Sequence, residues 1–309
     1  MNSDKTNITG LARILEHATY TNGYSPFVPW SNSIGFKVQS LRFQEKHSSS
    51  SIAEDFLANI GFTRNDIESE CSMQTYLESV GSVMLSFSCT EDNNHLRKIA
   101  LPQSVPLKMS LDSVLKSRRS IRQYTGDSIS FEYLATVARA ALGITSTSEV
   151  NLNDGSSTSI NLRTQPSAGG IYPTELYIAC LNVKKLDRGI YQYNPVEDCL
   201  VQLFDEKDTL KLLECFSVQE DQISLSRASA ICLLAGSAAK SMYKYGNRGL
   251  GFTLHEIGSI SQNIHLAITA LGLAGVDCAS YYNAEIHNLM KFDGIYKHLF
   301  HAIVIGVGR

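Results

Sequence analysis

The sequence lacks the features that mark metal-binding, disulfide-bonded and membrane proteins. Its eight histidines include no His-Glu-x-x-His or similar ligand spacing, and no Cys-x-x-Cys pair occurs. No apolar run is long enough to span a bilayer, and the first ten residues contain no apolar signal-peptide core. We therefore expect a cytoplasmic protein with reduced thiols, no metal site and no membrane partner. The seven cysteines are scattered, at positions 71, 89, 180, 199, 215, 232 and 278.

The chain also lacks a strong excess of either charge. It has 27 Lys and Arg against 30 Asp and Glu, a formal net charge of -3, so nothing favours nucleic acid as a partner. No Gly-x-Gly-x-x-Gly opens a helix after a strand, and the expected elements do not alternate as βαβ units, which disfavours a Rossmann domain. An α+β protein, a sheet packed between helices, fits these elements better. The 43% hydrophobic and 18% charged residues are an ordinary globular balance rather than a disordered one.

Two prolines, Pro102 and Pro106, punctuate a linker that divides the chain into two expected parts. Residues 1–105 form a predicted N-terminal extension. Its expected elements are three helices and a strand, over Thr6–His17, Ile52–Ile60, Asn65–Val80 and Val83–Phe87. Because this part contains none of the motifs described below, we expect it to serve assembly or peptide docking rather than redox chemistry.

Residues 106–309 mix long helices with strands. Ser130 and Gly143 bound one predicted helix. A longer helix is predicted over Thr253–Leu271, with one broad apolar face made of Leu254, Ile257, Ile260, Ile264, Ala267, Ile268 and Leu271. Strands are expected at Leu176–Asn182, Gly189–Tyr193, Leu200–Phe204, Ala230–Ala235 and Leu299–Val307. The Ser-, Thr-, Asn- and Gly-rich segment 145–164 reads as a long loop, a candidate flap over a site.

The segment RTQPSAGGIYPTELY, from Arg163 to Tyr177, is the most informative stretch of the sequence. Adjacent glycines allow close approach of the backbone to a ligand, and a serine with free N–H groups suits an oxygen-rich group such as a phosphate or a flavin edge. A tight loop before a strand is the simpler interpretation. The residues concerned are Pro166, Ser167, Ala168, Gly169 and Gly170.

Three further motifs follow the same order along the chain as in a known family. They are SRRSIRQY (Ser117–Tyr124), KYGNRGLGFTLHEIGSISQN (Lys244–Asn263) and LGLAGVDCASYY (Leu271–Tyr282). Taken with the PSAGG turn, this series resembles the flavin-dependent nitroreductase superfamily over roughly Leu111 to Arg309. Within it, the Lys-Tyr pair is similar to that of the SagB-type or McbC-like dehydrogenases, the azoline oxidases of thiazole- and oxazole-modified peptide biosynthesis.

The resemblance implies a nitroreductase-like fold, a mixed or antiparallel sheet flanked by helices, in an intertwined homodimer with FMN sites at its interface. Phosphate and pyrimidine contacts would come from Arg118, Arg119, Ser120 and Arg122, whose guanidinium groups match phosphate geometry. The turn Pro166–Gly170 would supply a second wall from the partner subunit. Ala279 and Ser280 match the place where relatives direct a backbone N–H at flavin N5. Arg309 could reach the phosphate, although a terminal arginine is more often solvated.

Lys244 and Tyr245 are the candidate catalytic residues. A neighbouring lysine would lower the pKa of Tyr245 and make its phenolate a usable base. The alternative is that the pair simply ends a surface helix. Relatives commonly continue as RGYR, where this chain has RGLG at 248–251, and many have histidine at position 259, which is serine here. The polar groups of Glu256 and of Gln262-Asn263 are expected to satisfy an interface.

The resemblance implies oxidation of thiazoline or oxazoline rings on a ribosomally made peptide, in a complex with cyclodehydratase subunits and the precursor peptide. Molecular oxygen would reoxidise the flavin. Two alternatives stay open. One is an NAD(P)H-dependent nitro or quinone reductase, and the other is a catalytically idle scaffold within the complex.

Overall fold

The computed structural model describes residues 56–57, 60, 74–76, 78–81, 83, 95–151 and 154–309. The chain divides into two compact units, Met1–Thr63 and Arg64–Arg309, and the second holds nearly all of the described residues. The predicted helix Thr6–His17 lies outside them. Those described between 74 and 83 are helical except Ser79, which agrees with Asn65–Val80 but not with a strand at Val83, whose N–H donates to the carbonyl of Ser79 at 3.1 Å. The division at residue 105 stays a prediction.

A seven-stranded sheet forms the centre of the second unit, with the strand order β1-β8-β7-β5-β9-β11-β10 and every pair antiparallel. This confirms the α+β, nitroreductase-like class. The strands are β1 (Lys98–Ala100), β5 (Thr174–Cys180), β7 (Gly189–Asn194), β8 (Cys199–Phe204), β9 (Ala230–Gly236), β10 (Ala274–Cys278) and β11 (His298–Gly306). A short parallel pair joins β2 (Ile129–Ser130) and β6 (Val183–Lys184). The predicted strands agree with these bounds to within about two residues.

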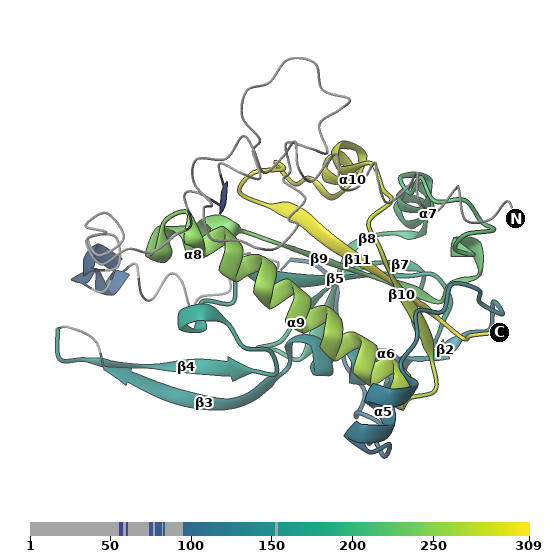
Figure 1. The fold of residues 1–309 in the computed structure, drawn as a ribbon, viewed down its shortest axis with the longest axis horizontal. Helices are drawn as coiled ribbons and strands as arrows, with labels where there is room; N and C mark the ends of the chain where they lie inside the picture. Colours follow the sequence, from purple (N-terminus) through teal and green to yellow (C-terminus); the bar gives the residue numbers. More distant parts are fainter. Residues whose placement is uncertain are drawn as a thin grey trace, which may run out of the picture. The chain divides into compact units, whose positions relative to one another are not determined.

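Helices cover both faces of the sheet (Figure 1). Since side chains alternate along a strand, β5 sends Leu176 and Ile178 into one apolar cluster and Tyr177 and Ala179 into another. The first cluster includes α6 (Phe131–Leu142) and α9 (Arg248–Ala270), and the second includes α7 (Glu206–Glu214) and α10 (Asn283–Met290). The helix predicted after Ser130 is confirmed, because Ser130 Oγ accepts a hydrogen bond from Tyr133 N and Gly143 ends α6.

The long helix α9 corrects two expectations. It begins at Arg248, five residues before the predicted start, and Leu254 is 47% exposed rather than packed. The rest of the apolar face, including Ile257, Ile260 and Ile264, is buried against α6 and the sheet of the same chain. This face therefore needs no partner surface, and it gives no argument for a dimer.

Segment 145–164 is a hairpin rather than an irregular loop. Strands β3 (Ile144–Asn151) and β4 (Ser157–Arg163) pair antiparallel, with Ser148 opposite Ile160. Asp154 Oδ1 accepts hydrogen bonds from the N–H and hydroxyl of Ser156 at the turn. In Figure 1 the hairpin extends away from the main sheet, and it leads directly into the PSAGG turn.

Two further observations concern only the described part of the chain. None of its helices is long and apolar enough to cross a membrane, and no three or more of its His, Cys, Asp and Glu side chains are placed to hold a metal ion. Its five cysteines, Cys180, Cys199, Cys215, Cys232 and Cys278, are free and buried.

Candidate functional site

The PSAGG turn lies against the Lys-Tyr pair in the same chain. The turn forms a short 3₁₀ segment, Ala168–Gly170, in which Gly169 has φ 63° and Gly170 has φ 67°. Lys244 and Tyr245 end helix α8 (Ala238–Tyr245). A Cβ at position 169 would lie 2.5 Å from Tyr245 Oη and 2.7 Å from Lys244 Nζ. Position 169 must therefore be glycine for two reasons, its left-handed backbone and the approach of both polar groups.

Glu256 on α9 hydrogen-bonds residues of the PSAGG turn and of the strand that follows it. Its carboxylate accepts hydrogen bonds from Thr174 N at 3.3 Å and from the Ser167 hydroxyl, and Ser167 Oγ accepts one from Tyr172 N at 2.9 Å. Glu256 is only 1% exposed, and this burial raises its pKa although the hydrogen bonds oppose the shift. Its polar group thus serves the fold of its own chain, and the expectation that it satisfies an interface is wrong.

The protonation of the pair differs from the expectation. Burial raises the pKa of Tyr245, and the nearby Tyr76 adds to the rise, so Lys244 does not lower it as predicted. Burial also lowers the pKa of Lys244, because a half-buried ammonium group loses hydration. Burial thus favours the uncharged form of both groups, the amine of Lys244 and the phenol of Tyr245, so lysine rather than tyrosine is favoured as the basic member of the pair.

The RGLG segment forms the first turn of α9. A Cβ on Gly249 would collide with the backbone of Ser241 and Met242 on α8, so this glycine permits the two helices to pack closely. Arg248 lies over the ring of Phe252 at 5.5 Å, and that ring meets Tyr245 edge-on with centroids 5.1 Å apart. The RGLG segment thus packs α9 against α8 beside the Lys-Tyr pair.

The arginine-rich segment Ser117–Tyr124, called the basic turn below, lies next to the C-terminus and the edge strand β10. Ile121 N donates to the carbonyl of Gly275 at 3.1 Å, and Arg309 N donates to the carbonyl of Gln123 at 3.2 Å. Ser120 pairs with Gly275 in a parallel bridge. The structure thus brings the backbone of Arg309 to the basic turn.

The guanidinium groups of this turn have donors to spare. Arg119 Nη1 donates to the carbonyls of Lys116 and Arg118 at 3.0 and 2.7 Å, and Arg122 Nη1 makes one long bond of 3.5 Å to Ser120 O. Within the described residues the guanidinium of Arg118 makes no hydrogen bond and no ion pair. Unsatisfied donors of fixed geometry suit a phosphate, so the residues present fit that group.

Ala279 and Ser280 follow β10 on the same edge of the sheet and are exposed. The N–H of Ser280 hydrogen-bonds the thiol of Cys278, and its carbonyl accepts from Ser217 N at 2.9 Å. These bonds fix the turn that leaves the strand.

The two groups of predicted residues lie at opposite ends of α9. Lys244 and Tyr245 precede its first residue, whereas Gly275, beside the basic turn, packs against Ile268 in its last turns. A helix of 23 residues is about 34 Å long. Figure 1 shows α8 at one end of this helix and α5 (Leu111–Ser117) toward the other. One chain therefore does not bring its basic turn to its own PSAGG turn.

Sequence reasoning missed a polar cluster around Asp277 on β10. The Asp277 carboxylate accepts a hydrogen bond from Ser261 Oγ at 2.7 Å and contacts Nε2 of His265 and His301 at 2.9 and 2.7 Å. Burial opposes ionisation of Asp277, but these hydrogen bonds outweigh it and hold its pKa far below the usual range. The available signal was one acidic residue in an apolar run, between Val276 and Cys278.

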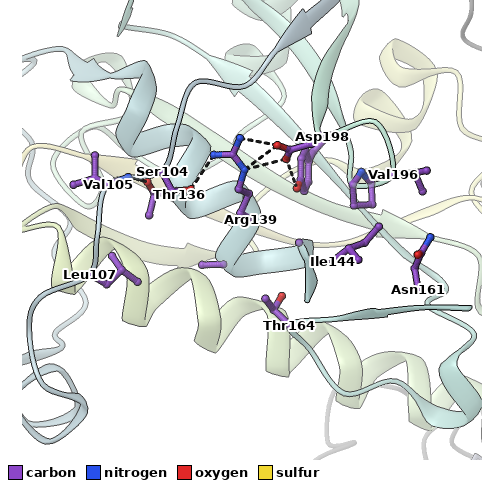
Figure 2. Close-up of a pocket in the computed structure, with 14 residues that line it drawn as sticks. Ser104, Val105, Leu107, Thr136, Arg139, Ile144, Asn161, Thr164, Val196 and Asp198 are labelled. Atoms are coloured by element: carbon purple, nitrogen blue, oxygen red, sulfur yellow. Dashed lines mark hydrogen bonds and ion pairs between the residues drawn. The ribbon is translucent and has the colours of Figure 1, made fainter. Parts of the chain in front are cut away.

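A cavity of about 680 Å³ lies apart from all the predicted site residues (Figure 2). It is lined by Ser104, Val105, Leu107, Thr136, Arg139, Ala140, Gly143, Ile144, Asn161, Thr164, Tyr193, Pro195, Val196 and Asp198.

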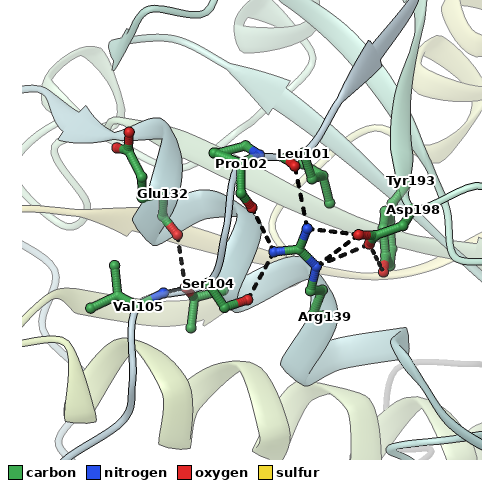
Figure 3. Close-up of polar contacts among 9 residues, drawn as sticks. Leu101, Pro102, Ser104, Val105, Glu132, Arg139, Tyr193 and Asp198 are labelled. Carbon is green, nitrogen blue, oxygen red and sulfur yellow. Dashed lines mark hydrogen bonds and ion pairs between the residues drawn. The ribbon is translucent and has the colours of Figure 1, made fainter.

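Arg139 of α6 fixes one wall of that cavity, as Figure 3 shows. Its Nη1 donates to Pro102 O at 2.7 Å and to Ser104 Oγ at 2.8 Å, and its Nη2 lies 2.7 Å from Asp198 Oδ2. Arg139 therefore ties the linker to the sheet, and its donors are used within the chain.

The sequence of this chain is similar to those of known proteins. The model of the nitroreductase family matches residues 115–309. A protein of Methanocaldococcus jannaschii that carries the nitroreductase name is 29% identical over 194 residues, which cover 63% of this chain and 89% of that protein.

Two solved structures have the same fold. A nitroreductase-type protein of Anabaena variabilis has a TM-score of 0.55 at 19% identity, over 71% of this chain but only 43% of the other. A chain of the E. coli microcin synthetase McbBCD complex, solved with truncated pro-MccB17 bound, has a TM-score of 0.51 at 19% identity, over 84% of this chain and 92% of the other.

Proposed function

Because this chain belongs to the nitroreductase family of oxidoreductases, whose members generally bind FMN, we propose that it is an FMN-dependent azoline dehydrogenase. It oxidises thiazoline or oxazoline rings of a ribosomally made peptide to thiazoles or oxazoles. The observation that carries this proposal is the contact between the PSAGG turn and the Lys244–Tyr245 pair, which places a basic amine and a phenol beside a turn suited to a flavin edge.

The chemistry assigns a role to each member of the pair. Conversion of an azoline to an azole removes two electrons and two protons, as one proton and one hydride. FMN, when bound, supplies the two-electron acceptor, and molecular oxygen is the final oxidant. The neutral amine of Lys244 takes the proton from the ring carbon next to the imine. The Tyr245 hydroxyl hydrogen-bonds the substrate, and its raised pKa keeps it protonated for that purpose.

The FMN site is proposed to be shared between two copies of the chain. One copy supplies Arg118, Arg119, Ser120, Arg122 and Arg309 for the phosphate side, with Ala279 and Ser280 at the ring. The partner copy supplies Pro166–Gly170 with the Lys-Tyr pair. The separation of these groups along α9 supports this arrangement, since an FMN molecule is shorter than the helix.

Exposed apolar side chains near the basic turn also support a partner there. They lie on the linker, on α5 and on the turn itself: Leu107, Met109, Leu111, Leu115 and Ile121, which are 36–64% exposed. An apolar group of this kind is typical of a surface that another chain covers.

The likeness to the microcin synthetase complex supports the peptide substrate and the cyclodehydratase partners. It covers 84% of this chain, more than the 63% in the relative from M. jannaschii, so it reaches beyond the part shared with that protein. Cytoplasmic location fits such a complex.

The deciding experiment supplies the FMN-loaded protein with an azoline-containing peptide in air. We expect a mass loss of about 2 Da per ring, from the two hydrogens removed. Lys244→Arg keeps a positive charge that cannot be neutralised, so it should lower the rate at least about a hundredfold. NAD(P)H-dependent reduction of nitroaromatics or quinones without azoline oxidation would favour a reductase instead. An inactive, FMN-loaded wild type would favour a scaffold.

A further inference from the structure

We propose that Tyr76, from the part of the chain that precedes the family match, is a positioning residue for Lys244. It deepens the proposed function, because it rests on Lys244 being the base of that reaction. The ring of Tyr76 fixes the terminal amine and limits its access to water.

The geometry around Lys244 is aromatic. Its Nζ lies 4.7 Å from the centroid of the Tyr76 ring and 5.3 Å from that of Tyr245. Both distances put the amine in contact with the ring faces. Attraction to a ring face favours the charged ammonium form, whereas the loss of hydration opposes it, and this loss is the cause of the lowered pKa of Lys244. Tyr76 is only 2% exposed, and its own ring meets Tyr243 edge-on with centroids 6.2 Å apart. Tyr76 is therefore buried among aromatic rings of α8.

The described residues around Lys244 offer its amine aromatic rings rather than a carboxylate. No carboxylate of the described residues forms an ion pair with it, and the nearest basic residues in sequence, Lys240 and Arg248, lie four positions away on either side. Within the described residues, the titratable side chains in contact with it are Tyr76 and Tyr245. Burial is the cause of the lowered pKa of Lys244, so solvent access decides how readily the amine loses its proton.

This placement gives the N-terminal part a role that the sequence did not suggest. The family match begins at residue 115, and none of the recognised motifs lies before Ser117. Nevertheless Tyr76 contacts a residue of the proposed reaction pair.

The test uses FMN-loaded protein labelled with [ε-¹³C]lysine and needs no substrate. The Lys244 resonance, assigned with Lys244→Arg, should show an upfield ring-current shift in the wild type and in Tyr76→Phe. In Tyr76→Ala the ring current should be lost, and the titration midpoint should rise by about one pH unit, a tenfold change in the neutral fraction. Tyr282→Ala is the matched control, because it removes an exposed tyrosine outside α8 and outside the ring cluster, and it should keep both signatures.

Several outcomes would overturn the proposal. They are a wild-type Lys244 signal without a ring-current shift, a midpoint unchanged or lowered in Tyr76→Ala, and a Tyr76→Phe variant that behaves like the alanine variant. The first and last of these need no folded Tyr76→Ala. With azoline peptide at pH 7, Tyr76→Ala should lower kcat about tenfold and leave KM within about twofold. If the wild type oxidises no azoline while the resonance behaves as expected, the proposed function fails and the positioning role stands.

Discussion

At the scale of single residues, Gly169 is the most constrained position of the candidate site. Gly169→Ala puts a Cβ where Tyr245 Oη and Lys244 Nζ now lie, and it forces alanine into a left-handed backbone. We expect the free energy of unfolding to fall by about 1–2 kcal/mol from the backbone alone. Displacement of the pair should also lower azoline turnover at least about tenfold, measured by mass spectrometry.

Gly155 provides the control for that substitution. It has φ +82° at the turn of the β3–β4 hairpin, and a Cβ there would meet nothing within 4 Å. Gly155→Ala should therefore show a similar backbone cost with normal turnover. Equal losses of turnover in the two variants would mean that contact with the Lys-Tyr pair is not what position 169 contributes.

Glu256 predicts a dependence of stability on pH. Its pKa in the folded state is raised above the usual 4.5, so folding binds a proton more tightly and stability falls as pH rises from 4.5 through the raised value. Glu256→Gln cannot titrate, so its melting temperature relative to the wild type should climb across this window. Glu149→Gln, on the exposed strand β3, is the matched control for the loss of one carboxylate. A melting-temperature difference for Glu256→Gln that does not change with pH would show that the pKa of Glu256 is not raised.

At the scale of elements, the sequence predicts the regular part of the fold well. The run Ala230–Ala235 is a buried strand because it is continuously apolar, and α6 lies between a serine cap and a glycine as its pattern indicates. The hairpin 144–163 escaped prediction because Ser, Thr and Asn dominate its strands and apolar side chains occur only at Ile144, Val150, Ile160 and Leu162, too few for a clear alternation. The early start of α9 escaped because Gly249 opposes a helix locally, yet packing against α8 requires it.

The candidate site could be predicted only in part, for a physical reason. Motif order identified the basic turn, the PSAGG turn and the Lys-Tyr pair, and the structure joins the last two. The order of the motifs could not indicate that burial would raise the pKa of Tyr245 and lower that of Lys244, because desolvation depends on side chains distant in sequence. Tyr76 and Asp277 escaped for the same reason, since their partners are tertiary.

The basic turn as an element should carry FMN affinity. Loss of one charge-assisted contact costs roughly 1.5–3 kcal/mol, or about ten- to a hundredfold in affinity. Arg118→Ala combined with Arg122→Ala should weaken FMN binding by at least that factor in a fluorescence titration, with an unchanged circular dichroism spectrum. Arg188→Ala, which removes a surface arginine paired with Glu206 at 2.9 Å, is the control. Unaltered affinity in the double variant would remove this turn from the site.

At the scale of the whole molecule, α9 acts as a spacer. Its buried face belongs to the core, and its two ends lie near the two groups of predicted residues, the basic turn near residue 270 and the Lys-Tyr pair near residue 248. A dimer is thus proposed to be necessary for function rather than merely for stability. Neither half of the site would work in an isolated chain.

If each site is shared between two chains, two inactive variants should complement each other in a mixed dimer. A chain with Arg118→Ala and Arg122→Ala and a chain with Lys244→Arg would each be inactive alone. In a mixed dimer, however, both lesions fall in one site and the other site is intact. After random exchange of subunits half of the dimers are mixed, so about a quarter of the wild-type rate should return. No recovery in a mixture whose mixed dimers are verified by mass spectrometry would mean that each site is built from a single chain. Two genes that each encode an inactive variant would then give activity when expressed together, because a 23-residue helix separates the two groups of residues.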